Sequence, residues 1–169
     1  IPSDCHEKEL FDFGKYFHDT SLNGNYSELS MYLETSPNAN TDTLSDVTLV
    51  STADQIGFSG FDATEVTKPV IEIKDINSDY CVYEMTYQLQ LGENGKTSYF
   101  NVKEYYKVRY STTRIFILDY RRNMEEIIDE NDVIQNNNNL TLGVTSKDIN
   151  YLSNETGTIT CFEQAGELF

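Results

Sequence analysis

The sequence predicts an α+β protein in which N-terminal helices pack on a strongly bent, cone-like antiparallel sheet. Three observations lead to this fold class. Apolar residues near the N-terminus recur at helical spacing, strand-like runs follow one another from Val70 to Tyr120, and the link Gly92–Gly95 joins the two longest runs as a hairpin. A chain of 169 residues is long enough for one domain with a substantial core. We assign residues 1–123 to that domain and residues 124–169 to an acidic, Asn-rich C-terminal extension.

Two helices are expected before the sheet. Apolar side chains three and four residues apart predict a first helix over residues 5–20. Asn25 is followed three residues later by a glutamate, which has the form of a capping box, so a short second helix is expected to start there and run to Leu33. His6 and His18, near the two ends of the first helix, are expected to be solvated.

Alternation of apolar and polar residues then replaces the helical spacing. In residues 80–91 the side chains at odd positions from Cys81 to Leu91 are mostly apolar, and those at even positions from Glu84 to Gln90 are polar. This alternation is typical of an antiparallel sheet with one buried face and one solvated face. Strands are expected at residues 47–50, around 56–61, and at 70–73, 80–91, 97–110 and 114–120.

The C-terminal extension differs in composition from the preceding domain. Residues 124–134 are expected to form a short acidic helix and residues 157–162 an edge strand. The extension is expected either to pack on the core or to link it to further structure.

The strong negative charge limits the classes of partner. A formal net charge of −16 repels nucleic-acid phosphates, so no nucleic-acid binding is expected. Residues 96–122 are the exception, because they carry two acids and seven bases. This basic segment is either a patch for an anionic ligand or a surface that docks against the chain's own acidic segments.

The sequence predicts no membrane span, because no run approaches the ~18 consecutive apolar residues that a spanning helix needs. The chain starts with Ile1 and Pro2 rather than Met. We therefore expect a processed or trimmed chain from which a signal peptide or anchor has been removed, and a secreted or cell-surface location outside the cytoplasm.

Three cysteines fit neither a dense disulfide scaffold nor a metal site, because no Cys-x-x-Cys or Cys/His spacing occurs. No metal and no cofactor are expected. Cys81 lies on the apolar side of its strand and is expected to be buried. Cys5 and Cys161 either form a disulfide between the two ends of the chain, which requires an oxidising compartment, or remain thiols.

Glu104 is unusual because it lies on the apolar side of a predicted strand. A buried carboxylate needs a partner or a raised pKa, and both features occur at functional sites. Together with Tyr16 and Tyr106, Glu104 would form a general acid/base site. Alternatively, a bulge or an open sheet end exposes it to water. The same two interpretations apply to Asp119.

Two segments resemble the nuclear transport factor 2-like superfamily. They are the turn SLNGNYSELSMYL at residues 21–33 and the strand pair YYKVRYSTTRIFILDYRR at residues 105–122. The resemblance implies a cone of helices and bent sheet, as in extracytoplasmic bacterial members. Other members are enzymes related to ketosteroid isomerase and scytalone dehydratase. Tyr16 lies near the position of a tyrosine in the isomerase-like enzymes, but their acidic pair has no clear counterpart here.

The sequence therefore favours a non-enzymatic binding or assembly module that recognises a protein partner or a small ligand. A clear catalytic pair is lacking, and tyrosines line the predicted sheet. Two alternatives stay open: a small isomerase- or dehydratase-like enzyme that works inside the cone, and a structural domain that self-associates, for example as a homodimer. The candidate binding residues are Tyr83, Tyr87, Tyr106, Arg109 and Arg114.

Overall fold

The computed structural model confirms an α+β protein with an antiparallel sheet. The chain divides into two compact units, Ile1–Ile128 and Asp129–Phe169. The main sheet extends past the boundary predicted at residue 123, because its last strand continues to Ile127. The residues that the structure describes are 5–38, 43–93, 96–127, 134–135, 139–140, 151–154, 156, 158, 160–164 and 167–168.

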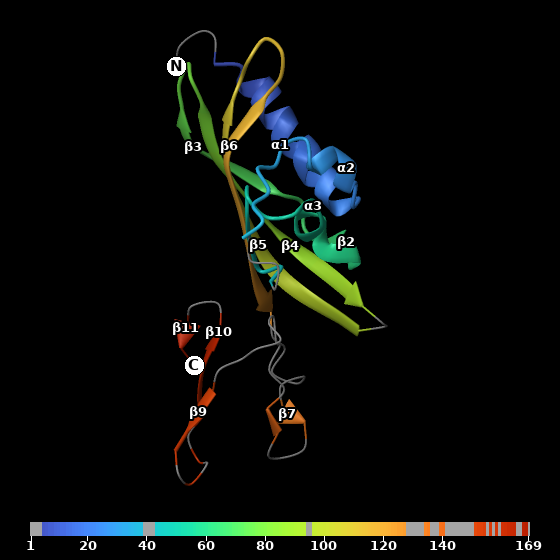
Figure 1. The fold of residues 1–169 in the computed structure, drawn as a ribbon, viewed down its shortest axis with the longest axis vertical. Coiled ribbons are helices and arrows are strands. Elements are labelled where there is room, and N and C mark those ends of the chain that lie inside the picture. Colours follow the sequence, from blue (N-terminus) through green and yellow to red (C-terminus); the bar gives the residue numbers. More distant parts are fainter. Residues whose placement is uncertain are drawn as a thin grey trace. The chain divides into compact units, whose positions relative to one another are not determined.

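Six antiparallel strands form the sheet of the first unit (Figure 1). The three long strands β4, β5 and β6 form its centre, β1 pairs with β6, and both β2 and β3 pair with β4. Because β3 pairs with the first half of β4 and β2 with its second half, these two short strands follow each other along one edge. The strands are β1 (Asp46–Thr48), β2 (Asp62–Glu65), β3 (Val70–Ile76), β4 (Cys81–Glu93), β5 (Lys96–Arg109) and β6 (Phe116–Ile127).

Helix α1 (Glu7–Leu22) lies against the inner face of the sheet and is followed by the short α2 (Tyr26–Leu29) (Figure 1). The first helix begins at Glu7, because His6 occupies the N-cap position with a left-handed φ of 51°. The second helix is shorter than expected. The Asn25 side chain donates to the Glu28 carboxylate at 2.6 Å and makes no cap hydrogen bond to the helix backbone.

The prediction of a strand around residues 56–61 is wrong. That region contains the end of α3 (Ala53–Ile56) and a short 3-10 helix, η1 (Phe58–Gly60), and the strand begins only at Asp62. The physical reason is a capping box between Thr52 and Gln55, whose side chains each accept a hydrogen bond from the other residue's backbone N–H.

The prediction of an acidic helix over residues 124–134 is also wrong for those residues that the structure describes. Residues up to Ile127 continue β6, and Ile134 belongs to the two-residue strand β7 (Ile134–Gln135), whereas residues 128–133 lie outside the described part. Tyr120, Arg122 and Met124 are all buried, so the alternation of the strand continues where the acidic residues begin.

The strongly bent, cone-like sheet is not supported. Strands β4, β5 and β6 twist but do not curl strongly (Figure 1). Bulges bend sheets locally, and here the two irregularities in pairing fall near Lys74 on the edge strand β3 and near Leu118 at the start of β6. Neither lies in the middle of the central strands, where a bulge would close a cone.

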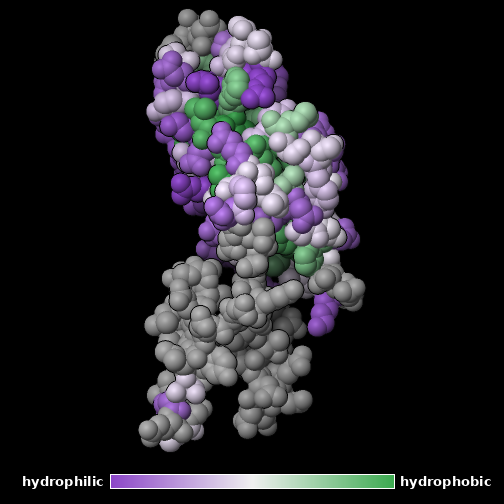
Figure 2. Space-filling view, in the orientation of Figure 1, coloured by the Kyte–Doolittle hydropathy of each residue, from purple (hydrophilic) through white to green (hydrophobic). Residues whose placement is uncertain are grey.

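The core lies between α1 and the inner face of the sheet. The predicted alternation is confirmed, because the odd-numbered residues of β4 from Cys81 to Leu91 are buried, as are the even-numbered residues of β5 from Phe100 to Val108. In the view of Figure 2 the surface of this unit is largely hydrophilic, and hydrophobic residues gather in a narrow central strip. Most residues between these buried ones are exposed or half-buried, so the other face of the sheet is the solvated one.

The second unit contains short antiparallel strands. β7 pairs with β8 (Asn139–Leu140), and β10 (Thr160–Gln164) lies between β9 (Tyr151–Ser153) and β11 (Glu167–Leu168). A strand was expected at residues 157–162, and β10 overlaps it. Its residues Thr160–Phe162 pair with β9, and Glu163 and Gln164 pair with β11. The side chain of Cys161 lies outside the described residues, so its pairing with Cys5 stays a prediction.

Gly14 makes the close approach of α1 to the sheet possible. A Cβ atom at this position would lie 2.1 Å from the Tyr83 hydroxyl oxygen and 2.7 Å from its ring. The Tyr83 ring stacks on Tyr106 with a centroid distance of 5.0 Å, so it has little freedom to move away.

We predict that Gly14→Ala destabilises the protein by about 2 kcal/mol in urea unfolding. Overpacking of a core costs up to about 3 kcal/mol, and the better helix propensity of alanine returns only about 1 kcal/mol. Lys15→Ala, at the next and exposed position, is the matched control and should change the unfolding free energy little. Equal or greater stability of the Gly14 variant would show that α1 does not pack this closely.

Candidate functional site

Glu104 is completely buried at the centre of β5. Its carboxylate accepts three hydrogen bonds from tyrosine hydroxyls: Tyr87 at 3.0 Å, Tyr120 at 3.3 Å and Tyr106 at 2.6 Å. The three tyrosines come from the three central strands. The interpretation that a bulge or an open sheet end exposes Glu104 is therefore wrong, because the strand is regular here and tertiary partners satisfy the carboxylate.

The three tyrosine hydroxyls donate to Glu104 in their protonated form. Burial, followed by the charge of Glu104, raises the pKa of Tyr106 and of Tyr87 well above the usual value. The same two causes raise the pKa of Tyr120. Their hydroxyl groups consequently stay protonated and can stabilise an ionised carboxylate.

His18, a residue of α1, lies between the Glu104 carboxylate and the Glu65 carboxylate of β2. Its side chain is 1% exposed, and its Nε2 lies 3.2 Å from the Glu65 carboxylate. Its Nδ1 lies 3.4 Å from Glu104, an ion-pair distance without hydrogen-bond alignment. The ring also packs edge-on against Tyr87. The prediction that His18 is solvated is wrong, because it lies one helical turn after Gly14 on the buried side of α1.

The two ionisable groups favour each other's charged form. Burial lowers the pKa of His18, but Glu104 and Glu65 outweigh burial, and the net pKa is raised. Burial raises the pKa of Glu104, but His18, Tyr106 and the Arg122 charge outweigh it, and the net pKa is lowered. The structure thus favours an imidazolium beside a carboxylate inside the core.

Arg122 is the second buried cation. It stands opposite Glu104 in the strand pairing of β5 with β6. Its Nη1 and Nη2 donate to the backbone carbonyls of Ile56 and Gln55 at 2.7 Å and 2.9 Å. The guanidinium lies over the Phe58 ring, 3.9 Å from its centroid. These contacts hold α3 and η1 on the inner face. The buried side chains of His18, Glu104 and Arg122, with the partly exposed Glu65 at their edge, form what we call the buried charge cluster.

The structure brings only one of the expected acid/base partners to Glu104. Tyr106 contacts it, whereas Tyr16 lies on the exposed side of α1 and donates to Glu28. Asp119 is partly exposed, beside the pairing irregularity of β6, and lies 3.6 Å from Arg121. Because the Glu104 carboxylate is hydrogen-bonded and closed to solvent, its direct effect is on packing of the core rather than on a substrate.

The five residues expected to bind a partner fall into two groups. Tyr83, Tyr87 and Tyr106 are buried, and their rings pack in the core beneath α1. Arg109 and Arg114 are exposed, and both lie over the Phe116 ring. The binding role of these residues remains a prediction, and of the five only the two arginines are exposed.

The basic segment is largely engaged by the chain itself. Lys107 lies over the Tyr80 ring, Lys103 lies 3.9 Å from Glu84, and Arg122 is buried. These contacts favour the interpretation that the bases pair with the chain's own groups over that of a continuous patch for an anionic ligand.

Sequence reasoning missed His18, Glu65, Tyr120 and Arg122. A signal existed for His18, because it follows Leu10 and Gly14 at intervals of four residues and so continues the buried side of the helix. Glu65 carried no such signal, since its strand was not predicted.

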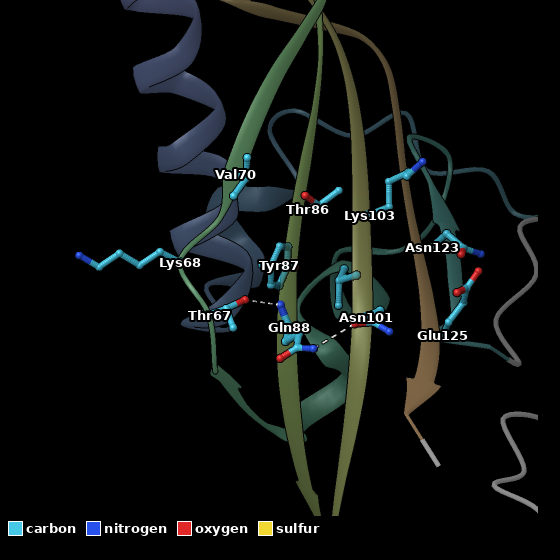
Figure 3. A pocket seen from close by; sticks show the side chains of 11 residues that line it. Thr67, Lys68, Val70, Thr86, Tyr87, Gln88, Asn101, Lys103, Asn123 and Glu125 are labelled. Carbon is cyan, nitrogen blue, oxygen red and sulfur yellow. Dashed lines mark hydrogen bonds between the residues drawn. The ribbon is translucent and has the colours of Figure 1, made fainter. Parts of the chain in front are cut away.

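An open groove of about 770 Å³ crosses the outer face of the sheet (Figure 3). The outward-pointing residues of the three central strands form most of its floor, and the buried residues Tyr87 and Val102 between them also line it. The Gln88 backbone N–H donates to Thr67 at 2.8 Å, and its side-chain amide donates to Asn101 at 3.2 Å, which fixes the floor (Figure 3). The lining residues are Thr67, Lys68, Val70, Thr86, Tyr87, Gln88, Asn101, Val102, Lys103, Asn123 and Glu125.

The groove offers polar groups of both kinds. Amides and hydroxyls supply donors and acceptors, Lys68 and Lys103 supply positive charge at two sides, and Glu125 supplies negative charge (Figure 3). Its volume lies within the ~300–1,000 Å³ range of ligand sites. The arrangement suits a polar ligand or a segment of a partner protein.

Metal and membrane sites receive no support from the described part of the chain. Nowhere in it do three His, Cys, Asp or Glu side chains gather closely enough to hold a metal ion. The helices described are also too short or too polar to cross a membrane. Comparison with known proteins yields no matching family model, no matching curated protein and no matching solved structure.

We predict that Tyr106→Phe lowers the free energy of unfolding by about 1.5–3 kcal/mol, the range for hydrogen bonds to charged groups. The substitution removes the shortest hydrogen bond to Glu104 and leaves the ring in place. Tyr105→Phe, the neighbouring residue on the outer face of β5, is the control, and urea unfolding is the measurement. If Tyr106→Phe and Tyr105→Phe both lowered the unfolding free energy by a similar small amount, the hydrogen bond to Glu104 would not contribute to stability as predicted.

We predict that the stability of the protein falls as the pH rises above about 6.5, and that His18→Gln removes this fall. The pKa of His18 is higher in the folded protein than in the unfolded chain. The stability that protonated His18 contributes is therefore fully present below its unfolded-state pKa of about 6.5 and is lost as the pH rises through the folded-state pKa. The lowered pKa of Glu104 acts on the acid side. The stability that ionised Glu104 contributes is fully present above its unfolded-state pKa of about 4.3. It is lost as the pH falls through the lower folded-state pKa.

Urea unfolding at pH 5.5, 7 and 8.5 measures this dependence. His6→Gln, which removes the other histidine of the same helix region, should keep the alkaline fall. An unchanged pH profile in His18→Gln would show that this histidine does not carry its charge in the folded protein.

Proposed function

We propose that this chain is a non-enzymatic, extracytoplasmic binding or assembly module that recognises a protein partner or a small polar ligand. The outer-face groove carries the proposal, because three neighbouring strands present amides, hydroxyls and charges there without covering them. Recognition surfaces of this kind combine polar groups with accessible volume.

The filled inner face supports binding rather than catalysis. The inner face is occupied by α1, by stacked tyrosines and by the buried charge cluster, so the groups that resemble an acid/base pair lie in the core. The groove, in contrast, combines an exposed carboxylate at Glu125 with lysines and amides and lacks a buried nucleophile or base.

Kinship with the nuclear transport factor 2-like superfamily forms part of the proposal. The order of two N-terminal helices followed by long antiparallel strands supports it, as do the turn at residues 21–33 and the strand pair at residues 105–122. In this proposal the cone interior is replaced by a packed core, and recognition moves to the other face of the sheet.

Site-specific photo-crosslinking in the source cells tests the proposal. A benzoylphenylalanine at Asn101, on the groove floor, should give a covalent adduct with a protein partner. The same residue at Lys15, exposed on α1, is the matched control and should not. Adducts from both positions, or from Lys15 alone, would contradict recognition through the groove.

A small ligand requires a different measurement. Native mass spectrometry of the chain purified from the source cells should then show a non-covalent adduct that Asn101→Trp removes by filling the groove. Lys15→Trp should retain the adduct. The absence of an adduct in both the crosslinking and the mass-spectrometric experiment would overturn the proposed binding function.

A further inference from the structure

Two arginines at one end of the sheet share a single aromatic ring. The guanidinium carbon of Arg114 lies 4.2 Å from the centroid of the Phe116 ring, and that of Arg109 lies 5.3 Å from the same centroid. The strand pairing explains this grouping, because Arg109 stands directly opposite Phe116 in the ladder of β5 and β6. Arg114 belongs to the loop that joins the two strands, at the same end of the sheet as the start of α1 (Figure 1).

Neither guanidinium is engaged by a carboxylate of the described residues. Arg121, on the neighbouring part of β6, lies 3.6 Å from Asp119. In the part of the chain that the structure describes, no Asp or Glu side chain lies within ion-pair distance of Arg109 or Arg114. Both side chains are exposed, although the chain carries a net charge of −16. Their positive charge is therefore accessible to an anion.

Stacking on the ring uses the face of a guanidinium and leaves its edge free. The N–H donors of arginine lie in the plane of the group, so a guanidinium held over a ring still directs them outward. Unlike Arg122, which donates to two backbone carbonyls, neither Arg109 nor Arg114 donates a hydrogen bond within the described residues. Phe116 thus restricts two side chains without occupying their donors, which lowers the entropy lost when a ligand orders them.

We propose that Arg109 and Arg114, held by Phe116, form a binding site for one tetrahedral oxyanion, a phosphate or sulfate group that is free or carried by a small molecule. Such a group presents at least three oxygen atoms, which is enough to accept hydrogen bonds from two guanidinium forks, whereas a carboxylate presents only two. The strong negative charge of the whole chain repels a long polyanion, so a small ligand with one such group fits best.

The arginine site is separate from the groove on the outer face. None of its three side chains lines the groove. Lys103, which does line it, precedes Arg109 by six residues on β5, or about 20 Å along a strand. Binding at the arginine site therefore goes beyond the proposed function and does not depend on it.

NMR titration of the full isotope-labelled chain with inorganic phosphate and with sulfate at pH 7 tests this site. Both anions should shift the side-chain Nε–H signals of Arg109 and Arg114 and the backbone amide signal of Phe116 in a saturable manner. Sodium chloride and sodium acetate at the same ionic strength are the control salts. Shifts of equal size with acetate, or no saturable shift with phosphate and sulfate, would overturn the proposal.

Methyl phosphate distinguishes the two sources of the group. Binding at least as tight as that of inorganic phosphate would support a ligand that carries the group as an ester. Weaker but saturable binding would support the free ion.

Substitutions separate recognition by the guanidinium forks from attraction by charge alone. Arg109→Lys and Arg114→Lys keep the charge but lose the planar fork, so each should weaken phosphate binding about tenfold, the loss expected for one hydrogen bond to a charged group. Arg121→Lys, outside the site, is the matched control and should keep the affinity. Unchanged affinity in both site variants would show attraction by charge alone and would overturn the proposal.

Two further variants test the ring and the independence from the groove. Phe116→Leu should weaken phosphate binding, because it removes the ring that holds both arginines. Asn101→Trp, which fills the groove, should leave phosphate binding unchanged. Failure of the arginine site and failure of recognition through the groove are therefore distinguishable.

Discussion

The ionised carboxylate of Glu104 inside the core is the constraint on which the rest of the first unit depends. A buried charge has to be satisfied by several partners at once, and here they come from every central strand and from α1. Only one register of β4, β5 and β6 places the three hydroxyl groups around it, because a slip of one residue turns the side chains to the other face. The cluster thus specifies the arrangement of the fold as well as contributing to its stability.

The two faces of the sheet have different physical roles. The inner face is filled with aromatic rings and with charges that compensate each other, which leaves water no access to Glu104. The outer face keeps its amides, hydroxyls and lysines in contact with solvent. The proposed recognition role is compatible with this division, since a stable core can support an accessible polar surface that changes without disturbing the fold.

The strands and the first helix were predictable because their signals are local. Alternation from Cys81 to Leu91 and the helical spacing that includes Phe13 and Phe17 depend on one segment at a time. The charge cluster was only half predictable. Glu104 was recognised as unusual, but its partners are distant in sequence, and only the folded sheet brings Arg122 opposite it. Curvature also depends on where bulges fall, and hydrophobic patterns do not encode that position.

The balance of the buried charge cluster has a consequence for how this protein can evolve. With His18 protonated, its two cations offset the two carboxylates of Glu65 and Glu104, so loss of any single member leaves an uncompensated charge in or next to the core. Substitution at one of these positions is tolerated best when a second member changes with it. Among relatives of this chain, positions 18, 65, 104 and 122 should therefore covary, although they lie on four different elements and the first and last are more than a hundred residues apart in sequence.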